Sequence, residues 1–201
     1  MEIISKILFG IANSLLIPDI ILLIVFFIRA LMLLGSTYNQ FMVRRRNNHR
    51  LAGVIKILQP TAIGELRSLL PERHESLFTE YLADILDHPS SEAYTDYLIT
   101  QYETEVAKDV NLARLLTKLG PVLGLIGTLI SMSPALVGLS TGDISGMAYN
   151  MQVVFSATVV GLVISAVGLF TKQLKTRWYA RDVNNLDFVS RIYAESHEKE
   201  A

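Results

Sequence analysis

The chain of 201 residues contains no cysteine. Disulfide bonds, thiolate metal ligands and a cysteine nucleophile are therefore excluded. The four histidines all lie in polar segments, where an isolated imidazole is usually solvated, so we predict neither a metal site nor a cofactor. The net charge is only −1, and the basic residues form no face of the kind that binds nucleic acid.

Charge is also nearly absent from one long stretch. Between Lys118 and Lys172 the only charged residue is Asp143, which lies in a short polar segment between two apolar runs. The whole chain is 51% hydrophobic, with a mean hydropathy of +0.38. This composition predicts an all-α integral membrane protein rather than a soluble domain.

Three apolar stretches reach the ~20 residues that a membrane-spanning helix needs. They cover about 15–34, 119–139 and 148–171, and Pro18 and Asp19 resemble a helix start in the first. A cleaved signal peptide is the competing interpretation of that first stretch. It lacks a convincing small-x-small cleavage site, and three arginines follow closely at 44–46, so we favour a retained span.

The basic residues predict the orientation in the membrane. Of the 18 lysines and arginines, ten lie from Arg44 to Lys118 and six from Lys172 onward, whereas the segment around Asp143 has none. Because positive residues favour the cytoplasmic side, we expect the N-terminus outside and the C-terminus inside an inner (cytoplasmic) membrane.

The remaining segments read as helices outside the membrane. No helix breaker separates the polar stretch after Ser91 from the second span until Pro121, which predicts one continuous rod. Gly53, Pro60 and Gly64 predict broken helix over 44–65. The predicted regions are an outer-face amphipathic helix (1–17), the first transmembrane helix (18–43), a cytoplasmic helical region (44–118), a transmembrane hairpin (119–171) and a cytoplasmic C-terminal helix (172–201).

Small residues recur at helical spacing in the two later spans. Such a stripe allows helix backbones to approach closely, and it can also line a narrow pore. The sequence alone leaves both interpretations open. Together with Pro121, which lies beside its first member, the stripe comprises Gly120, Pro121, Gly124, Gly127, Ser131, Gly161, Ser165 and Gly168.

Two threonines lie symmetrically about the polar segment. Thr128 precedes Asp143 by fifteen residues and Thr158 follows it by fifteen. With a rise of ~1.5 Å per residue, both hydroxyls are expected near the middle of the membrane and level with each other. A buried threonine can bond its own helix, so neither must do chemistry. Two hydroxyls beside small residues nevertheless favour a narrow polar cavity.

The hairpin has no acidic residue at depth, although a proton relay usually needs one. Either the hairpin is not a proton pathway, or another polypeptide supplies the carboxylate. Arg29 reads as the only charge within a span, at a cost of about 2.5–3.5 kcal/mol if central. We expect it to snorkel toward the cytoplasmic side or to pair with a neighbouring subunit.

The motifs of the hairpin resemble the MotA/TolQ/ExbB proton-channel family. The second span contains PVLGLIGTLISM and the third MQVVFSATVVGLVISAVGLF. The family typically has a Pro and a Gly-Leu-x-Gly-Thr stretch in one helix and a Thr-x-x-Gly-Leu stretch in the next. The matching residues are Pro121, Gly124, Leu125, Gly127, Thr128, Thr158, Gly161 and Leu162.

The resemblance implies a ring, typically a homopentamer, around two copies of a single-span partner resembling ExbD, TolR or MotB. The partner's aspartate would carry the proton, and Thr128 and Thr158 would line its path. The chain departs from ExbB and TolQ at Val153, where those proteins carry a glutamate, and it lacks the fourth span of MotA. A divergent three-span motor or stator subunit is the resulting hypothesis.

Two other classes of function are alternatives to the motor or stator subunit. A non-conducting membrane scaffold would use the small stripes only for packing. An intramembrane enzyme is disfavoured because the serines of the spans have no His, Asp or Lys beside them as a base. The coupling ion stays open between proton and sodium, since hydroxyls can also ligate a hard cation.

Overall fold

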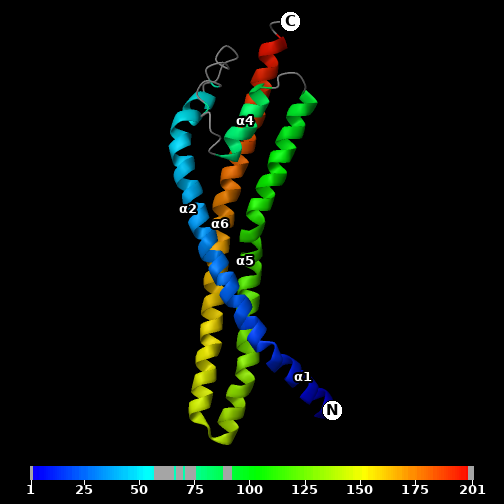
Figure 1. Ribbon diagram of the computed structural model, residues 1–201, viewed down its shortest axis with the longest axis vertical. Helices are drawn as coiled ribbons and strands as arrows, with labels where there is room; N and C mark the ends of the chain where they lie inside the picture. The colour runs from blue at the N-terminus through cyan, green and yellow to red at the C-terminus, as the bar shows by residue number, and fades with distance from the viewer. Residues whose placement is uncertain (1, 57–65, 67–69, 71–75, 88–91, 199–201) are drawn as a thin grey trace. The chain divides into compact units, whose positions relative to one another are not determined.

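The computed structural model describes residues 2–56, 66, 70, 76–87 and 92–198, and the regular structure in these residues is helical. Three stretches, Lys6–Arg46, Ala93–Thr141 and Ile144–Glu195, are long and apolar enough to cross a membrane. Within the described residues, the predicted all-helical fold with three helices able to span a membrane is therefore confirmed. The helices are α1 (Glu2–Ser14), α2 (Leu16–Lys56), α4 (Leu77–Asp87), α5 (Glu92–Thr141) and α6 (Ile144–Glu198) (Figure 1).

The chain forms two compact units. The hairpin unit consists of Met1–Gly35 and Asn111–Lys172, and the bundle unit of Ser36–Val110 and Gln173–Ala201. The boundaries fall inside α2, α5 and α6, so each of these helices contributes one part to each unit.

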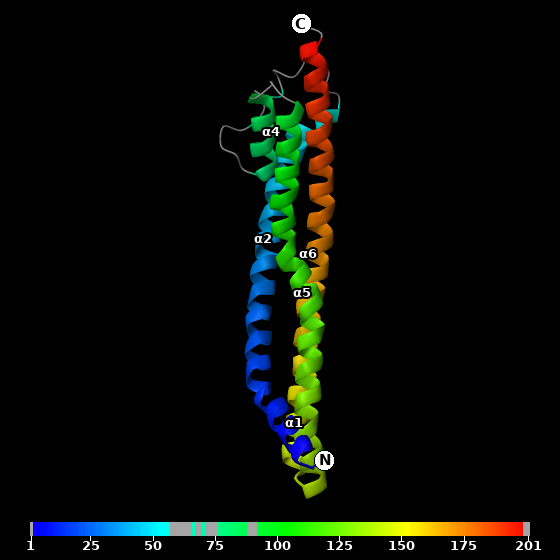
Figure 2. The ribbon, with the colours of Figure 1, turned by 90° about the vertical axis from the view of Figure 1, so that its right-hand side faces the viewer.

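In the hairpin unit, α5 and α6 run antiparallel and side by side, joined by a short turn (Figures 1 and 2). Gly142 has a φ of 78°, a left-handed conformation that side chains disfavour. Asp143 follows, and its Oδ1 accepts a hydrogen bond of 2.9 Å from the backbone N–H of Gly146. Asp143 therefore caps the start of α6, which gives the one charge of this stretch a structural role.

Helix α5 continues without interruption for 50 residues, through both Pro121 and Pro134. The prediction of one continuous helix from the polar stretch after Ser91 into the second span is confirmed. Helix α6 likewise continues for 55 residues, through the predicted third span and the segment after it.

The first long helix differs from the prediction at both ends. It begins at Leu16, so Pro18 lies in its first turn, where the missing N–H costs nothing. It then continues to Lys56, so the prediction of broken helix is wrong for residues 44–56. Gly53 is accommodated because a glycine costs a helix only about 1 kcal/mol. Residues 57–65 lie outside the described part of the chain.

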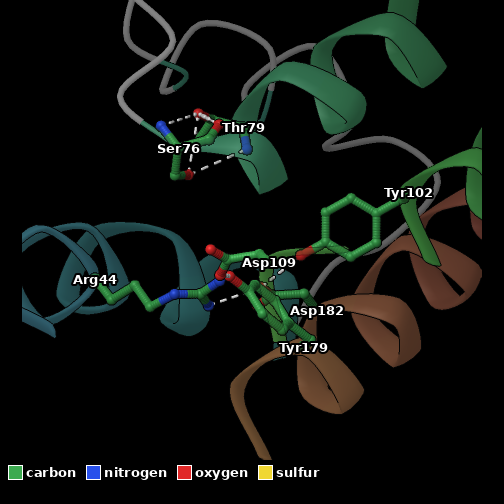
Figure 3. A network of polar contacts seen from close by, with 7 residues as sticks. All are labelled: Arg44, Ser76, Thr79, Tyr102, Asp109, Tyr179 and Asp182. Carbon is green, nitrogen blue, oxygen red and sulfur yellow. Dashed lines mark hydrogen bonds and ion pairs between the residues drawn. The ribbon is translucent and has the colours of Figure 1, made fainter. Parts of the chain in front are cut away.

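The bundle unit has an apolar core built by α4, α5 and α6. One face of α5 contributes Leu98, Tyr102, Val106 and Val110, whereas Tyr94 and Tyr97 are exposed. Ser76 caps α4, because its Oγ accepts the N–H of Thr79 at 3.3 Å and its carbonyl accepts the Thr79 hydroxyl at 2.7 Å (Figure 3).

Candidate functional site

The small residues of the stripe lie where α5 meets α6. A Cβ atom added to Gly120 would come within 2.6 Å of the carbonyl oxygen of Gly161, and one added to Gly161 within 2.5 Å of that of Gly120. Gly124 lies against Ala157, Thr158 and Gly161. These contacts are with backbone atoms, so no side chain could be accommodated without moving the helices apart.

The same close approach continues toward the other end of the hairpin. A Cβ atom on Gly168 would come within 2.8 Å of the carbonyl oxygen of Ala113 and 2.7 Å of the backbone nitrogen of Thr117. In this single chain, the four glycines at 120, 124, 161 and 168 therefore pack α5 against α6.

Ser165 and Pro121 are connected through one carbonyl group. Proline has no N–H, so Pro121 leaves the carbonyl of Thr117, four residues earlier, without its helical donor. The hydroxyl of Ser165 donates a hydrogen bond of 3.0 Å to this carbonyl from the opposite helix. The serine thus satisfies the polar group that the half-buried proline releases, which allows α5 to continue through an apolar region.

Thr128 and Thr158 are both half-buried, and each hydroxyl bonds its own helix. Thr128 donates to the carbonyl of Leu125 at 2.7 Å, and Thr158 donates to that of Val154 at 3.2 Å. Gly124 lies against the backbone of Thr158, and a Cβ added to Gly127 would come within 2.9 Å of Ala157 Cβ, so Thr128 and Thr158 lie within about one helical turn of each other along the hairpin.

The first span holds a carboxylate that the sequence analysis had placed at a helix start. Asp19 is only 4% exposed, and it lies against Gly127, whose added Cβ would come within 2.9 Å of Asp19 Oδ2. Arg29, in contrast, is exposed. The prediction that Arg29 is the only charge within a span is therefore wrong. Asp19 shares a helix face with the buried Leu23 and Ala30, a spacing that could have indicated its burial.

Ser131 is the remaining member of the stripe. It is 1% exposed, and its hydroxyl finds no hydrogen-bond partner within the described residues. It lies one turn after Gly127 on the same face of α5, the face that Asp19 contacts.

The bundle unit contains a buried polar network that the sequence analysis missed (Figure 3). Arg44 of α2 forms an ion pair of 2.7 Å with Asp182 of α6, and the hydroxyl of Tyr102 of α5 donates to the same carboxylate at 2.8 Å. Burial raises the pKa of Asp182, and the neighbouring guanidinium and phenol groups oppose that rise. One carboxylate therefore connects three helices.

A second carboxylate extends the network. Asp109 accepts a hydrogen bond from the hydroxyl of Tyr179 and forms an ion pair of 2.7 Å with Lys175, whose side chain is 1% exposed. The guanidinium of Arg44 lies 5.1 Å from the centre of the Tyr179 ring and 5.3 Å from that of Trp178, in cation–π geometry. These residues lie far apart in the sequence, and each alone resembles a solvated side chain.

Burial also raises the pKa of the two tyrosines in this network. For Tyr102, desolvation has the largest effect, followed by the charge of Asp182, while Arg44 acts in the opposite direction. For Tyr179, desolvation is followed by the hydrogen bond to Asp109. Both phenols therefore stay protonated, as donors, throughout the physiological range.

Among the residues that the structure describes, no three His, Cys, Asp or Glu side chains form a group that could hold a metal ion.

A sequence profile of the MotA/TolQ/ExbB proton channel family matches residues 72–187, more than half of the chain. The chain belongs to this family. A comparison with curated proteins gave no significant match.

The MotA/TolQ/ExbB match confirms the resemblance seen in the hairpin and extends it over α4, the whole of α5 and most of α6. Members of this family are channel and stator proteins rather than enzymes, so the chain has a membrane, ion-channel type of function. The match includes Thr128 and Thr158 but not Asp19 or Arg29, which precede it.

Proposed function

We propose that the chain is a ring-forming subunit of an ion-driven membrane motor, with the proton as coupling ion. A ring of several copies, a pentamer by family resemblance, would enclose a single-span partner resembling ExbD, TolR or MotB. The proton would travel on the partner's aspartate past Thr128 and Thr158. Each unit charge that crosses releases about 2.3 kcal/mol per 100 mV, which would drive the movement of the partner.

The observation that carries this proposal is the family match over a hairpin with hydroxyls and no free acid. Between Lys118 and Lys172 the only charged residue is Asp143, which caps α6 at the turn. Thr128 and Thr158 are half-buried, so part of each side chain is exposed in the single chain. Their hydroxyls can accept further hydrogen bonds, because each uses only its proton on its own helix.

The proposed location is the inner membrane, with the N-terminus outside. The excess of lysine and arginine in 44–118 and 172–201 supports a cytoplasmic position for both regions. Residues 1–17 would then lie at the outer face, and 18–43 and 119–171 within the membrane.

Proton flux into liposomes that contain the chain and its partner tests the proposal. Thr128→Val and Thr158→Val should each lower the flux about 10- to 150-fold, since one hydrogen bond to a charged group contributes about 1.5–3 kcal/mol. Ser156→Ala is the matched control, because this exposed hydroxyl also bonds its own helix, at the carbonyl of Gln152. Unchanged flux in both threonine variants would exclude the assigned pathway. A sodium gradient in place of the proton gradient identifies the ion.

A non-conducting scaffold is the second candidate, and the packing of the four glycines between α5 and α6 favours it. A scaffold needs neither a ring nor a partner's aspartate. Cross-linking that stops at a dimer, together with no flux in the presence of the partner, would support it over the motor.

A further inference from the structure

Asp19 places an acidic group between the helices of the hairpin unit. Both carboxylate oxygens are buried and find no hydrogen-bond partner among the described residues. The atoms nearest a Cβ added at Gly127 are Ala157 Cβ, Asp19 Oδ2 and Leu23 Cδ1, so the carboxylate shares this place with two apolar side chains. A Cβ at 127 would lie 2.9 Å from both Oδ2 and Ala157 Cβ, so a larger residue there would force one of these groups to move.

The depth of the group follows from these contacts. Gly127 lies eight residues after Leu119 and twelve before Leu139, the ends of the second apolar run. At ~1.5 Å per residue, both ends of the run are more than ~10 Å away along the helix axis. Asp19 is therefore at the level of Thr128 and Thr158, away from the water of either interface.

An ionised carboxylate at such a place is strongly disfavoured unless a proton or a cation neutralises it. Charged neighbours do not supply the neutralisation: between Lys118 and Lys172 the only charged residue is Asp143, at the turn, and the nearest positive residue on α2 is the exposed Arg29, ten residues on. Hard cations take six or more oxygen ligands, which the apolar surroundings cannot provide. A proton is the ligand that remains.

Ser131 gives a second, independent observation. Its buried hydroxyl also finds no partner in the described chain, and it lies one turn from Gly127 on the face that Asp19 contacts. A protonated carboxyl group has both a donor and an acceptor to offer a hydroxyl. Two unsatisfied polar groups thus lie on facing helices within one turn of each other.

We propose that Asp19 is an exchangeable proton-binding site of this chain itself, with Ser131 as its hydrogen-bonding partner. The site does not depend on the proposed ring or on the partner's aspartate. It can therefore be tested on the chain alone, and its failure would leave the proposed motor function standing.

The test is labelling of the full chain in liposomes with dicyclohexylcarbodiimide, an apolar reagent that modifies protonated carboxyl groups, followed by mass spectrometry. Asp19 should be labelled, the yield should fall as the pH rises, and sodium should give no protection. Asp19→Asn should abolish this label, whereas Asp143→Asn, at the exposed turn, should retain it. Ser131→Ala should move the pH midpoint upward, because the ionised form loses a hydrogen-bond donor.

Three results would overturn the proposal. Protection by sodium would identify a cation site, and a yield that does not change with pH would exclude proton exchange. An unlabelled Asp19 alongside a labelled Asp143 would show that the buried group is not protonated. A midpoint that stays unchanged in Ser131→Ala would remove the serine from the site.

Discussion

In the hairpin unit, α5 and α6 approach each other through glycines, with backbone against backbone. In the bundle unit, other parts of the same two helices are connected by aromatic rings and by charged side chains that neutralise one another. A membrane offers little hydrophobic driving force between helices, so close packing and hydrogen bonds must hold them. Outside a membrane, burial of large apolar side chains supplies the driving force, and polar groups fix the arrangement. The two halves of α5 and α6 therefore differ in residue type in the way that these two environments would favour.

The charged network of the bundle unit should show the largest effect. Asp182→Ala leaves Arg44 without its carboxylate and Tyr102 without its acceptor, and should lower the free energy of unfolding by about 3 kcal/mol. Denaturation of the purified protein in mixed micelles measures this loss. Asp187→Ala is the control, since its ion pair with Arg191 is exposed and should contribute less than about 0.5 kcal/mol.

The double variant Asp182→Ala with Arg44→Met should recover part of the loss, because the unpaired charge is then absent. A double variant as unstable as Asp182→Ala alone would show that the buried charge is not the cause.

The second-largest loss of stability should come from disturbing the glycine packing in the hairpin unit. Gly161→Ala places a methyl group against the carbonyl of Gly120 and should cost roughly 1–3 kcal/mol of stability. Gly35→Ala is the matched control in a helix, since nothing lies within 4 Å of its added Cβ, and it should stabilise by about 0.5–1 kcal/mol. Thermal unfolding of both variants under the same conditions makes the comparison; equal melting temperatures would contradict the packing argument.

Alkaline pH should affect the bundle unit through Tyr102. Its pKa is raised in the folded state, so the unfolded chain loses this proton first as the pH passes the usual tyrosine value of 10.0. The stability is thus complete below that pH and should fall above it by about 1.4 kcal/mol per pH unit for this group. Tyr102→Phe should reduce the slope, because the group whose pKa is raised in the folded state is then absent. Unfolding curves at several alkaline pH values report the slopes, and identical slopes would refute the assignment.

The smallest effect concerns the proline in α5. Ser165→Ala should cost about 1 kcal/mol, because the carbonyl of Thr117 loses its donor. In the background of Pro121→Ala the same change should cost almost nothing, since the new N–H can bond that carbonyl within the helix. A double-mutant cycle on unfolding free energies measures the coupling. Additive effects would mean that the serine does not compensate for the proline.

The sequence predicted the parts of the fold that depend on local pattern. The three apolar runs, the rod from the polar stretch through Pro121, and the turn at Asp143 all follow from composition and spacing. The family resemblance rested on short motifs that lie within one hairpin, and the profile match confirms it.

What the sequence could not show depends on contacts between distant segments. Pro18 and Asp19 match a helix start, and only the approach of Gly127 reveals that the aspartate is buried. Arg44, Tyr102 and Asp182 meet from three helices, so no spacing connects them. The role of Ser165 becomes visible only when the carbonyl of Thr117 is seen opposite it.

The turn at residues 141–143 provides a place at which the orientation of the chain in the membrane can be measured. Because the chain has no cysteine, Ser140→Cys would introduce a unique thiol at an exposed position beside the turn, with little change in shape. A membrane-impermeant maleimide applied to intact cells would react only if this end faces the periplasm or medium. A single reagent would thus decide which way the protein is inserted in the membrane.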